Sequence, residues 1–319
     1  MALKGWLDVH GHFFLPSSET ERKQRNQQMR DACFLVPETW NWSLDDTLAY
    51  MDKAGIQLQM LSYLPPDLQK LKAANDFAAK MVEKHPTRFG QLAVIPHDDT
   101  DSALVEMDRA VTDLEADGFA VSAVYNGVYF SDPSVEPVWK KLNELKATVF
   151  VHPWAYASPT DGRPTPVIDV AFETTKVMVD ALYRGLFRRY PDINIIVAHS
   201  GGCLPVLSGR LALLGTEPWV PNPEGITKEE VKEQLSRLYV DTAATAETGL
   251  QPALKMVGKD HVVYGADCGV PCSTQATMEE NRRSVINVGE SLGVEGDQIG
   301  TNAWKLFPSA AARVEGASK

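Results

Sequence analysis

Eight short apolar runs, separated by longer amphipathic stretches, constrain the fold of this chain more than any other feature of its sequence. Short runs rich in Val and Ile are typical of buried strands, and the longer amphipathic stretches are typical of helices. Strict alternation of the two predicts an α/β fold, a (β/α)8 TIM barrel. The expected strands are Trp6–His12, Ile56–Tyr63, Arg88–Pro96, Ala120–Tyr125, Thr148–Pro153, Ile193–His199, Leu238–Thr242 and His261–Asp267.

Capping residues mark the helices between these strands. Ser43 is expected to cap a helix that ends at Gly55, and a second helix is predicted over Asp67–Lys84. Thr227 with Glu230 forms a capping-box pattern at the start of another.

The competing fold is a doubly wound open sheet. No G-x-G-x-x-G motif follows any expected strand, so the nucleotide-binding version of that fold has no support.

The chain is expected to form one domain. Barrels of this kind routinely run past about 250 residues, and the 319 residues contain no repeat, low-complexity tract or linker that would divide them. We therefore predict a single barrel domain over residues 1–319. Residues 17–42 are long for a barrel loop and contain a polar stretch followed by the apolar Phe34-Leu-Val. They are predicted to form an insertion over the barrel mouth.

Charge and hydropathy exclude two kinds of partner. The 31 basic and 42 acidic residues give a formal charge of −11, and a phosphate backbone needs cations, so nucleic acid is not expected to bind. No window reaches the roughly 18 apolar residues of a membrane helix, and Asp8 and His10 interrupt the apolar core that a signal peptide requires. Four cysteines in the whole chain argue against a disulfide scaffold. A cytoplasmic location is therefore expected.

Histidine and aspartate side chains gather at the carboxyl ends of the expected strands. His10 and His12 are two apart in the first strand, so both rings project to the same side. His152, His199 and Asp267 end the fifth, sixth and eighth strands. All carboxyl ends of barrel strands open on one face, where active sites are built. These five side chains are therefore expected to converge on one mouth.

Each of these residues also has a plain structural interpretation. Two strand histidines can be core residues whose nitrogens bond to backbone groups, and an Asp at a strand end is often a helix cap. The conjunction favours a site, because four of the seven histidines in the chain fall at such positions. Imidazole with carboxylate suits Zn, Fe or Mn, and an open coordination position would make the metal catalytic.

The motifs around these residues resemble the amidohydrolase superfamily, and within it the aminocarboxymuconate-semialdehyde decarboxylase-like branch, which includes decarboxylases of hydroxybenzoates, 6-methylsalicylate and carboxyuracil. The resemblance extends from Asp8 nearly to the end of the chain. It rests on Asp8-Val-His10-Gly-His12, Val151-His152-Pro153-Trp154, His199-Ser-Gly-Gly202, Gly265-Ala-Asp267 and Gly300-Thr-Asn302-Ala-Trp-Lys-Leu-Phe307.

The resemblance implies roles for these residues. His10, His12, His152 and Asp267 would hold one divalent metal ion, Zn2+ in the first place and Mn2+ as the alternative. His199 would be a catalytic acid or base beside it. No Lys after the fourth strand suits a carbamylated bridge, which fits a site for one metal ion.

Substrate binding follows from the same resemblance. Gly209-Arg210 matches a family position at which an arginine reaches a neighbouring subunit's site and binds a substrate carboxylate, so a homodimer is implied. A second family arginine is absent from Asp46–Asp52, which favours a monocarboxylic aromatic acid. Without the resemblance, Arg210 would be an ordinary solvated helix arginine.

Several aromatic residues are expected near the mouth, where they can line a pocket for a flat ring or simply pack the first loop against the barrel. They are Phe13, Phe14, Trp40, Trp42, Trp154 and Tyr156.

These features support three hypotheses about function. The first is non-oxidative decarboxylation of an aromatic acid of the salicylate type, such as 6-methylsalicylate, with a proton supplied by Asp267 or His199. The second is hydrolysis of a lactone, ester or amide by a metal-bound hydroxide. The third is a metal-binding barrel without catalysis, against which the presence of His199 argues. The motif alone does not separate decarboxylation from hydrolysis.

Overall fold

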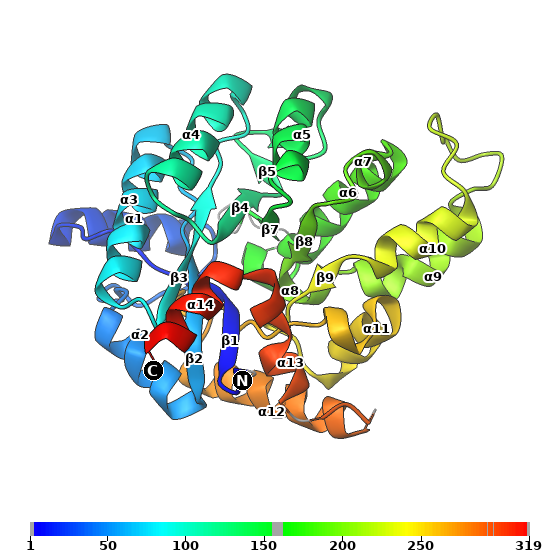
Figure 1. Ribbon diagram of the computed structural model, residues 1–319. Coiled ribbons are helices and arrows are strands. Elements are labelled where there is room, and N and C mark those ends of the chain that lie inside the picture. The colour runs from blue at the N-terminus through cyan, green and yellow to red at the C-terminus, as the bar shows by residue number, and fades with distance from the viewer. Residues whose placement is uncertain (1–2, 155–161, 292, 296, 318–319) are drawn as a thin grey trace.

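A curled parallel sheet forms the centre of the molecule in the computed structural model (Figure 1), which describes residues 3–154, 162–291, 293–295 and 297–317. Seven strands are hydrogen-bonded in the order β1-β2-β3-β4-β7-β8-β9, and every neighbouring pair is parallel. Their bounds are Trp6–His12, Ile56–Ser62, Phe89–Val94, Gly118–Ser122, Thr148–His152, Asn194–Val197 and Tyr239–Val240. The α/β barrel-like fold that the alternation predicted is confirmed.

The eighth strand is where the prediction and the structure differ. The segment predicted as the strand His261–Asp267 forms isolated bridges instead, Val262 to Val240 of β9 and Cys268 to Gly11 of β1. Side chains form hydrogen bonds with the backbone of this segment. Thr242 and Asn281 donate to the carbonyl of Gly265, and the amide N–H of Ala266 donates to the Asp8 carboxylate. Because those groups are already bonded, a regular ladder does not form, although the segment still connects β9 to β1.

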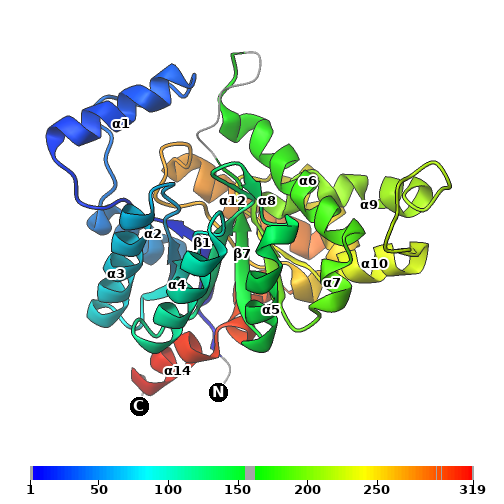
Figure 2. The same ribbon diagram turned by 90° about the horizontal axis from the view of Figure 1, so that it is seen from above.

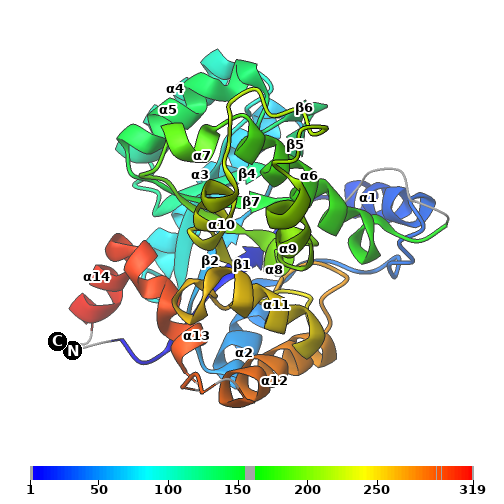
Figure 3. The ribbon, with the colours of Figure 1, turned by 90° about the vertical axis from the view of Figure 1, so that its right-hand side faces the viewer.

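Helices surround the sheet in the views of Figures 1 and 3. The longer ones are α1 (Glu19–Asp31), α2 (Leu44–Ala54), α3 (Leu68–Lys84), α4 (Thr100–Thr112), α5 (Glu136–Glu144), α6 (Asp169–Tyr183), α9 (Leu204–Leu214), α10 (Lys228–Ser236), α11 (Glu247–Val257), α12 (Gln275–Ser291) and α14 (Pro308–Ala317). Shorter elements are α7 (Leu186–Arg189), α8 (Ala198–Gly201), α13 (Gln298–Thr301), the β5–β6 hairpin (Val124–Tyr125 and Val128–Tyr129) and the 3-10 turns η1 (Pro133–Val135), η2 (Thr165–Val167), η3 (Lys259–His261) and η4 (Asn302–Leu306).

The caps that the sequence predicted are present. The Ser43 side chain accepts from the amide N–H of Asp46, and Gly55 ends α2 with φ of 71°, a left-handed conformation that glycine adopts without steric cost. Thr227 and Glu230 form the capping box of α10. Of the described helices, none is both long and apolar enough to cross a bilayer.

Side chains on the two faces of the strands form two apolar clusters. One face packs with residues such as Leu7, Met60 and Phe150 around Phe307 of the C-terminal segment. This interior cluster fills the barrel and supports the floor of its mouth, since the Phe150 ring lies 4.8 Å from the ring of His10. At the opposite end, α14 is anchored by Arg313, whose guanidinium donates two 2.8 Å hydrogen bonds to Asp117.

The segment after β1 leaves the barrel and returns. Figure 2 shows α1 standing away from the other helices, at the side of the barrel mouth. Phe14, Met29 and Val36 form a small separate apolar cluster there, and Asn26 of α1 donates to the carbonyls of Glu38 and Trp40. Tyr63 and Val270, which lie outside this segment, pack against the cluster, so it joins the segment to the barrel.

Candidate active site

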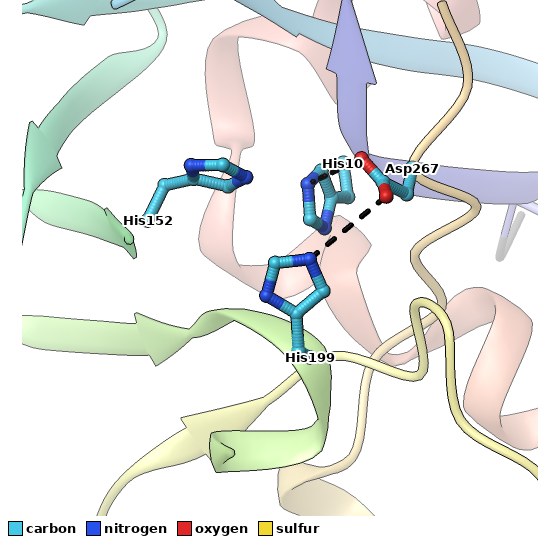
Figure 4. A group of neighbouring side chains, drawn as sticks. All are labelled: His10, His152, His199 and Asp267. Atoms are coloured by element: carbon cyan, nitrogen blue, oxygen red, sulfur yellow. Dashed lines mark ion pairs between the residues drawn. The ribbon is translucent and has the colours of Figure 1, made fainter. Parts of the chain in front are cut away.

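Four side chains from four parts of the barrel converge at its mouth. Their potential ligand atoms, one from each of His10, His152, His199 and Asp267, all lie within 4.8 Å of one another. Figure 4 shows the three rings and the carboxylate approaching a common centre from different sides. His10 belongs to β1 and His152 ends β7, while His199 lies in α8 directly after β8. The predicted convergence of strand ends is therefore found.

His12 lies against this group without belonging to it by the same distance criterion. Its Nε2 is 2.9 Å from Nε2 of His10 and 3.2 Å from Oδ1 of Asp267. Nδ1 of His12 lies 3.2 Å from the carbonyl oxygen of Ser62. If Nδ1 carries the proton and donates to that carbonyl, the lone pair of Nε2 faces the centre of the site.

His10 and His152 are held in the same way. Nδ1 of His10 lies 2.6 Å from Oδ2 of Asp241, and Nδ1 of His152 lies 2.7 Å from the carbonyl oxygen of Pro153. An acceptor at Nδ1 fixes the tautomer in which Nε2 is free to bind a cation, as is usual for metal-binding imidazoles. Three rings with anchored Nδ1 atoms beside a buried carboxylate fit one divalent ion.

His199 is held differently from the other three rings. It follows β8 in a turn in which His199 and Ser200 have φ of 55° and 54°, left-handed values that residues other than glycine seldom adopt. Its Nε2 faces Oδ2 of Asp267 at 3.9 Å, and its buried Nδ1 has no hydrogen-bond partner among the described residues. The sequence predicted the position of this ring but not the turn that presents it.

Burial and the Asp267 carboxylate set the charges of the cluster. Burial lowers the pKa of His152 well below its usual range, and the neighbouring rings lower this pKa further. Burial also lowers the pKa of His12. Burial opposes the charge on His10 too, but the carboxylates of Asp267 and Asp241 outweigh it and raise the pKa of His10 to about 10. Neutral rings at His12 and His152 are ready to bind a cation, which would replace the proton of His10.

A pocket of about 330 Å³ opens above this cluster. Its wall is largely apolar and includes Phe14, Phe34 and Trp154, and its floor includes His12, His152, His199 and Asp267. No Lys or Arg lines it among the described residues. Pockets of this size with apolar walls and a few convergent polar groups are typical of small-molecule sites. Phe14 and Trp154 thus lie where the sequence placed them, while Tyr156 lies outside the described residues.

The sequence model of the amidohydrolase family matches residues 7–279. The chain belongs to the amidohydrolase family. Among curated members, the decarboxylase yanB of Aspergillus niger is 30% identical over 95% of this chain and 87% of its own length. A 6-methylsalicylic acid decarboxylase of Penicillium expansum is 29% identical over 82% of this chain and 84% of its own length.

Among solved structures, a dihydroxybenzoic acid decarboxylase of Polaromonas sp. with bound manganese is similar to this chain. The TM-score is 0.76 with 24% sequence identity, and the match covers 96% of this chain and 97% of that one. At this identity the likeness shows the shared fold. The predicted relationship to the decarboxylases of this family is confirmed by the curated relatives together.

Arg210 lies outside the pocket of its own chain. It is exposed on α9 and is not a lining residue. Val206 and Leu213 of the same helix are 70% and 63% exposed, and the nearby Trp219 is 69% exposed. The site of a single chain therefore has no guanidinium among the residues described.

Asp241 is a residue of the site that the sequence prediction missed. It lies directly after β9, is fully buried, and contacts Nδ1 of His10. The signal was present, because Asp241 lies in the expected strand Leu238–Thr242, near the end at which the other site residues cluster. An aspartate there looks like a helix cap in the sequence, and only the contact between strands distinguishes the two roles.

Proposed function

We propose that the protein is a metal-dependent, non-oxidative decarboxylase of an aromatic carboxylic acid. The observation that carries the proposal is the cluster of anchored imidazoles and one carboxylate at the floor of an apolar pocket. The named activities of the family's curated members support it, since several are decarboxylases of aromatic acids. A salicylate-type acid, such as 6-methylsalicylate, is the proposed substrate.

The proposed metal ligands are His10, His12, His152 and Asp267. The anchored Nδ1 atoms of the three rings support this set, because each leaves Nε2 free on the side of Asp267. His199, whose ring has no such anchor, is proposed as the acid or base. Zn2+ suits imidazole and carboxylate ligands, and Mn2+, which a protein of similar fold binds, is the alternative.

The bound ion would act as a Lewis acid toward the hydroxyl and carboxylate oxygens of the substrate. Phe14, Phe34 and Trp154 would hold the flat ring and exclude water. His199 and Asp267, 3.9 Å apart at the floor, are the groups that can hold a proton beside the ring. One of them would protonate the ring carbon that bears the carboxylate. The bond from that carbon to the carboxylate then breaks, its electron pair returns to the ring, and CO2 leaves.

A homodimer completed by Arg210 is part of the proposal. The pocket contains no cationic side chain among its described lining residues, and a guanidinium matches a carboxylate through two parallel hydrogen bonds. The exposed apolar residues of α9 around Arg210 are suited to contact a second copy.

We further propose that residues 17–42 are an insertion over the mouth, since Phe34 lines the pocket. The scarcity of cysteines supports the proposal that the enzyme is cytoplasmic.

Release of CO2 tests this function directly. The metal-loaded protein should release CO2 from carboxyl-labelled salicylate or 6-methylsalicylate, and not from 3-hydroxybenzoate, which lacks the hydroxyl beside the carboxylate. The purified protein should contain about one divalent ion per chain, and the variant H10A should contain none and be inactive. Hydrolysis of simple lactones or esters without CO2 release would instead support the hydrolase alternative.

A further inference from the structure

The Asp241 carboxylate receives hydrogen bonds on both of its oxygens. Nδ1 of His10 lies 2.6 Å from Oδ2. The backbone N–H of Ser200 donates to Oδ1 at 3.0 Å, and the backbone N–H of Ala243 donates to the same oxygen at 3.2 Å. The Ser200 hydroxyl also donates to the backbone carbonyl of Asp241 at 3.1 Å. One buried side chain thus connects the first strand of the barrel with the turn that follows β8.

These donors match a carboxylate, which can accept hydrogen bonds on both of its oxygens. An amide at this position offers an acceptor on one side and donors on the other. If its oxygen faced Ser200 and Ala243, its NH2 would face His10 and turn the Nδ1 of that ring into an acceptor. If its oxygen faced His10, its NH2 would oppose two backbone N–H groups. Asparagine therefore satisfies one end of the contact at the expense of the other.

The two ends of the contact serve different parts of the site. On the Oδ2 side, an acceptor at Nδ1 holds one proton of His10 on that atom, so that a cation would bind at Nε2, the atom nearest to Asp267. On the Oδ1 side, the N–H of Ser200 belongs to the left-handed turn that carries His199. Such a backbone conformation persists only where surrounding contacts hold it. Removing the carboxylate should therefore disturb both the binding of a cation by His10 and the turn that holds His199.

We propose that Asp241 is a positioning residue that links metal binding by His10 to the placement of the acid–base ring of His199. It is not among the proposed ligands and does not line the pocket. The inference rests on the metal site of the proposed function. It adds a residue whose carboxylate holds the ring of His10 through one oxygen and the turn that carries His199 through the other.

The test compares D241N with D8N in the full-length protein. Asp8 is a matched control because it is equally buried and also accepts three hydrogen bonds, from the backbone N–H groups of His10 and Ala266 and from the Gln59 amide. None of these donors is an imidazole. Both variants should lower the thermal midpoint. Only D241N should raise the Kd for Zn2+, about 10- to 100-fold, while D8N should stay within about threefold, as measured by competition with a chelator.

A second variant tests the contact without changing the acid. A Cβ on Gly265 would lie 2.9 Å from Oδ2 of Asp241 and 2.9 Å from Cβ of His10, so G265A should press the two apart and weaken Zn2+ binding in the same direction. This result tests the contact if D241N does not fold.

The effect of Asp241 on His199 is tested through turnover. At saturating Zn2+, kcat should fall in D241N, and the double variant D241N/H199A should be no slower than H199A alone.

Several outcomes would overturn the inference. They are wild-type Zn2+ affinity in both D241N and G265A, equal losses of affinity in D241N and D8N, or additive losses of kcat in the double variant. A wild-type protein that binds no Zn2+ or Mn2+ would overturn the proposed function itself, and so the two failures are distinguishable.

Discussion

His12 and His199 both lie beside Asp267 and differ in how their rings are held. Nδ1 of His12 lies beside a carbonyl acceptor, whereas Nδ1 of His199 has no partner among the described residues. We therefore expect H12A to lose the bound metal. H199A should retain it and lose turnover by about 10²- to 10⁴-fold, the usual contribution of a general acid or base. Metal analysis of the purified variants and their rates of CO2 release provide the measurement.

The variant H85A controls for loss of a histidine as such, because His85 ends α3 and lies outside the site. It should match the wild type in metal content and rate. Loss of metal from H199A together with retention by H12A would exchange the roles of the two residues.

The sequence predicted the side chains of the site but not the contacts and backbone conformations that hold them in place. His10, His152 and Asp267 could be predicted because each lies in or at the end of an expected strand, and parallel strands end on one face. The role of Asp241 could not, because it depends on which strand lies beside which and at what register. The left-handed backbone of His199 could not either, since His and Ser do not favour positive φ and contacts elsewhere in the fold hold it.

His97, in the loop after β3, gives the fold a pH dependence separate from the active site. Its Nε2 lies 3.1 Å from the carbonyl of Val128 in the β5–β6 hairpin, and the ring packs against Tyr125 and Phe130. Burial lowers the pKa of His97 to about 4. The folded protein therefore stays unprotonated there while the unfolded chain takes up a proton below pH 6.5. Stability should fall by up to about 3 kcal/mol between pH 6.5 and pH 4, and remain constant in this respect above pH 6.5.

The variant H97F isolates this contribution, since phenylalanine keeps a buried ring and cannot titrate. Urea unfolding at a series of pH values should show the stability of H97F falling less steeply than that of the wild type between pH 6.5 and pH 4. Parallel curves for the two proteins over that range would show that His97 does not take up its proton on unfolding.

Among the elements, the predicted strands were found where hydrogen bonds run from strand to strand, and the prediction failed where side chains take their place. Thr148–Pro153 and β7 nearly coincide, because Val and Phe favour a buried strand and nothing competes for its backbone. The segment before Asp267 also contains Val and Tyr, but Thr242, Asn281 and Asp8 bind its backbone groups. These partners are distant in the sequence and invisible to local periodicity. A glycine separates α6 from α7 for a local reason, since Gly185 adopts φ of 66°.

The whole molecule is expected to work as a pair of chains. If Arg210 completes the partner's pocket, R210A should retain its metal and show a higher KM or no turnover. Mixing R210A with H10A should then restore part of the activity, because a mixed dimer contains one pocket with both an intact metal site and an arginine. Steady-state rates of the mixture after verified subunit exchange measure this.

The variant R237A is a suitable control, because Arg237 is a surface arginine that donates to the carbonyl of Pro191, away from the described pocket. It should not change KM. A mixture of R210A and H10A as inactive as its components would exclude completion between chains, and full activity of R210A alone would make Arg210 a surface charge only.

The start of β1 and the C-terminal helix α14 lie at the same end of the barrel, the end opposite α1 (Figures 2 and 3). Leu3 packs on the same interior cluster as α14, and α14 is fastened to the barrel through Arg313 and Asp117. A tag, a reporter domain or a solid support attached through either end therefore leaves the path of small molecules into the mouth clear.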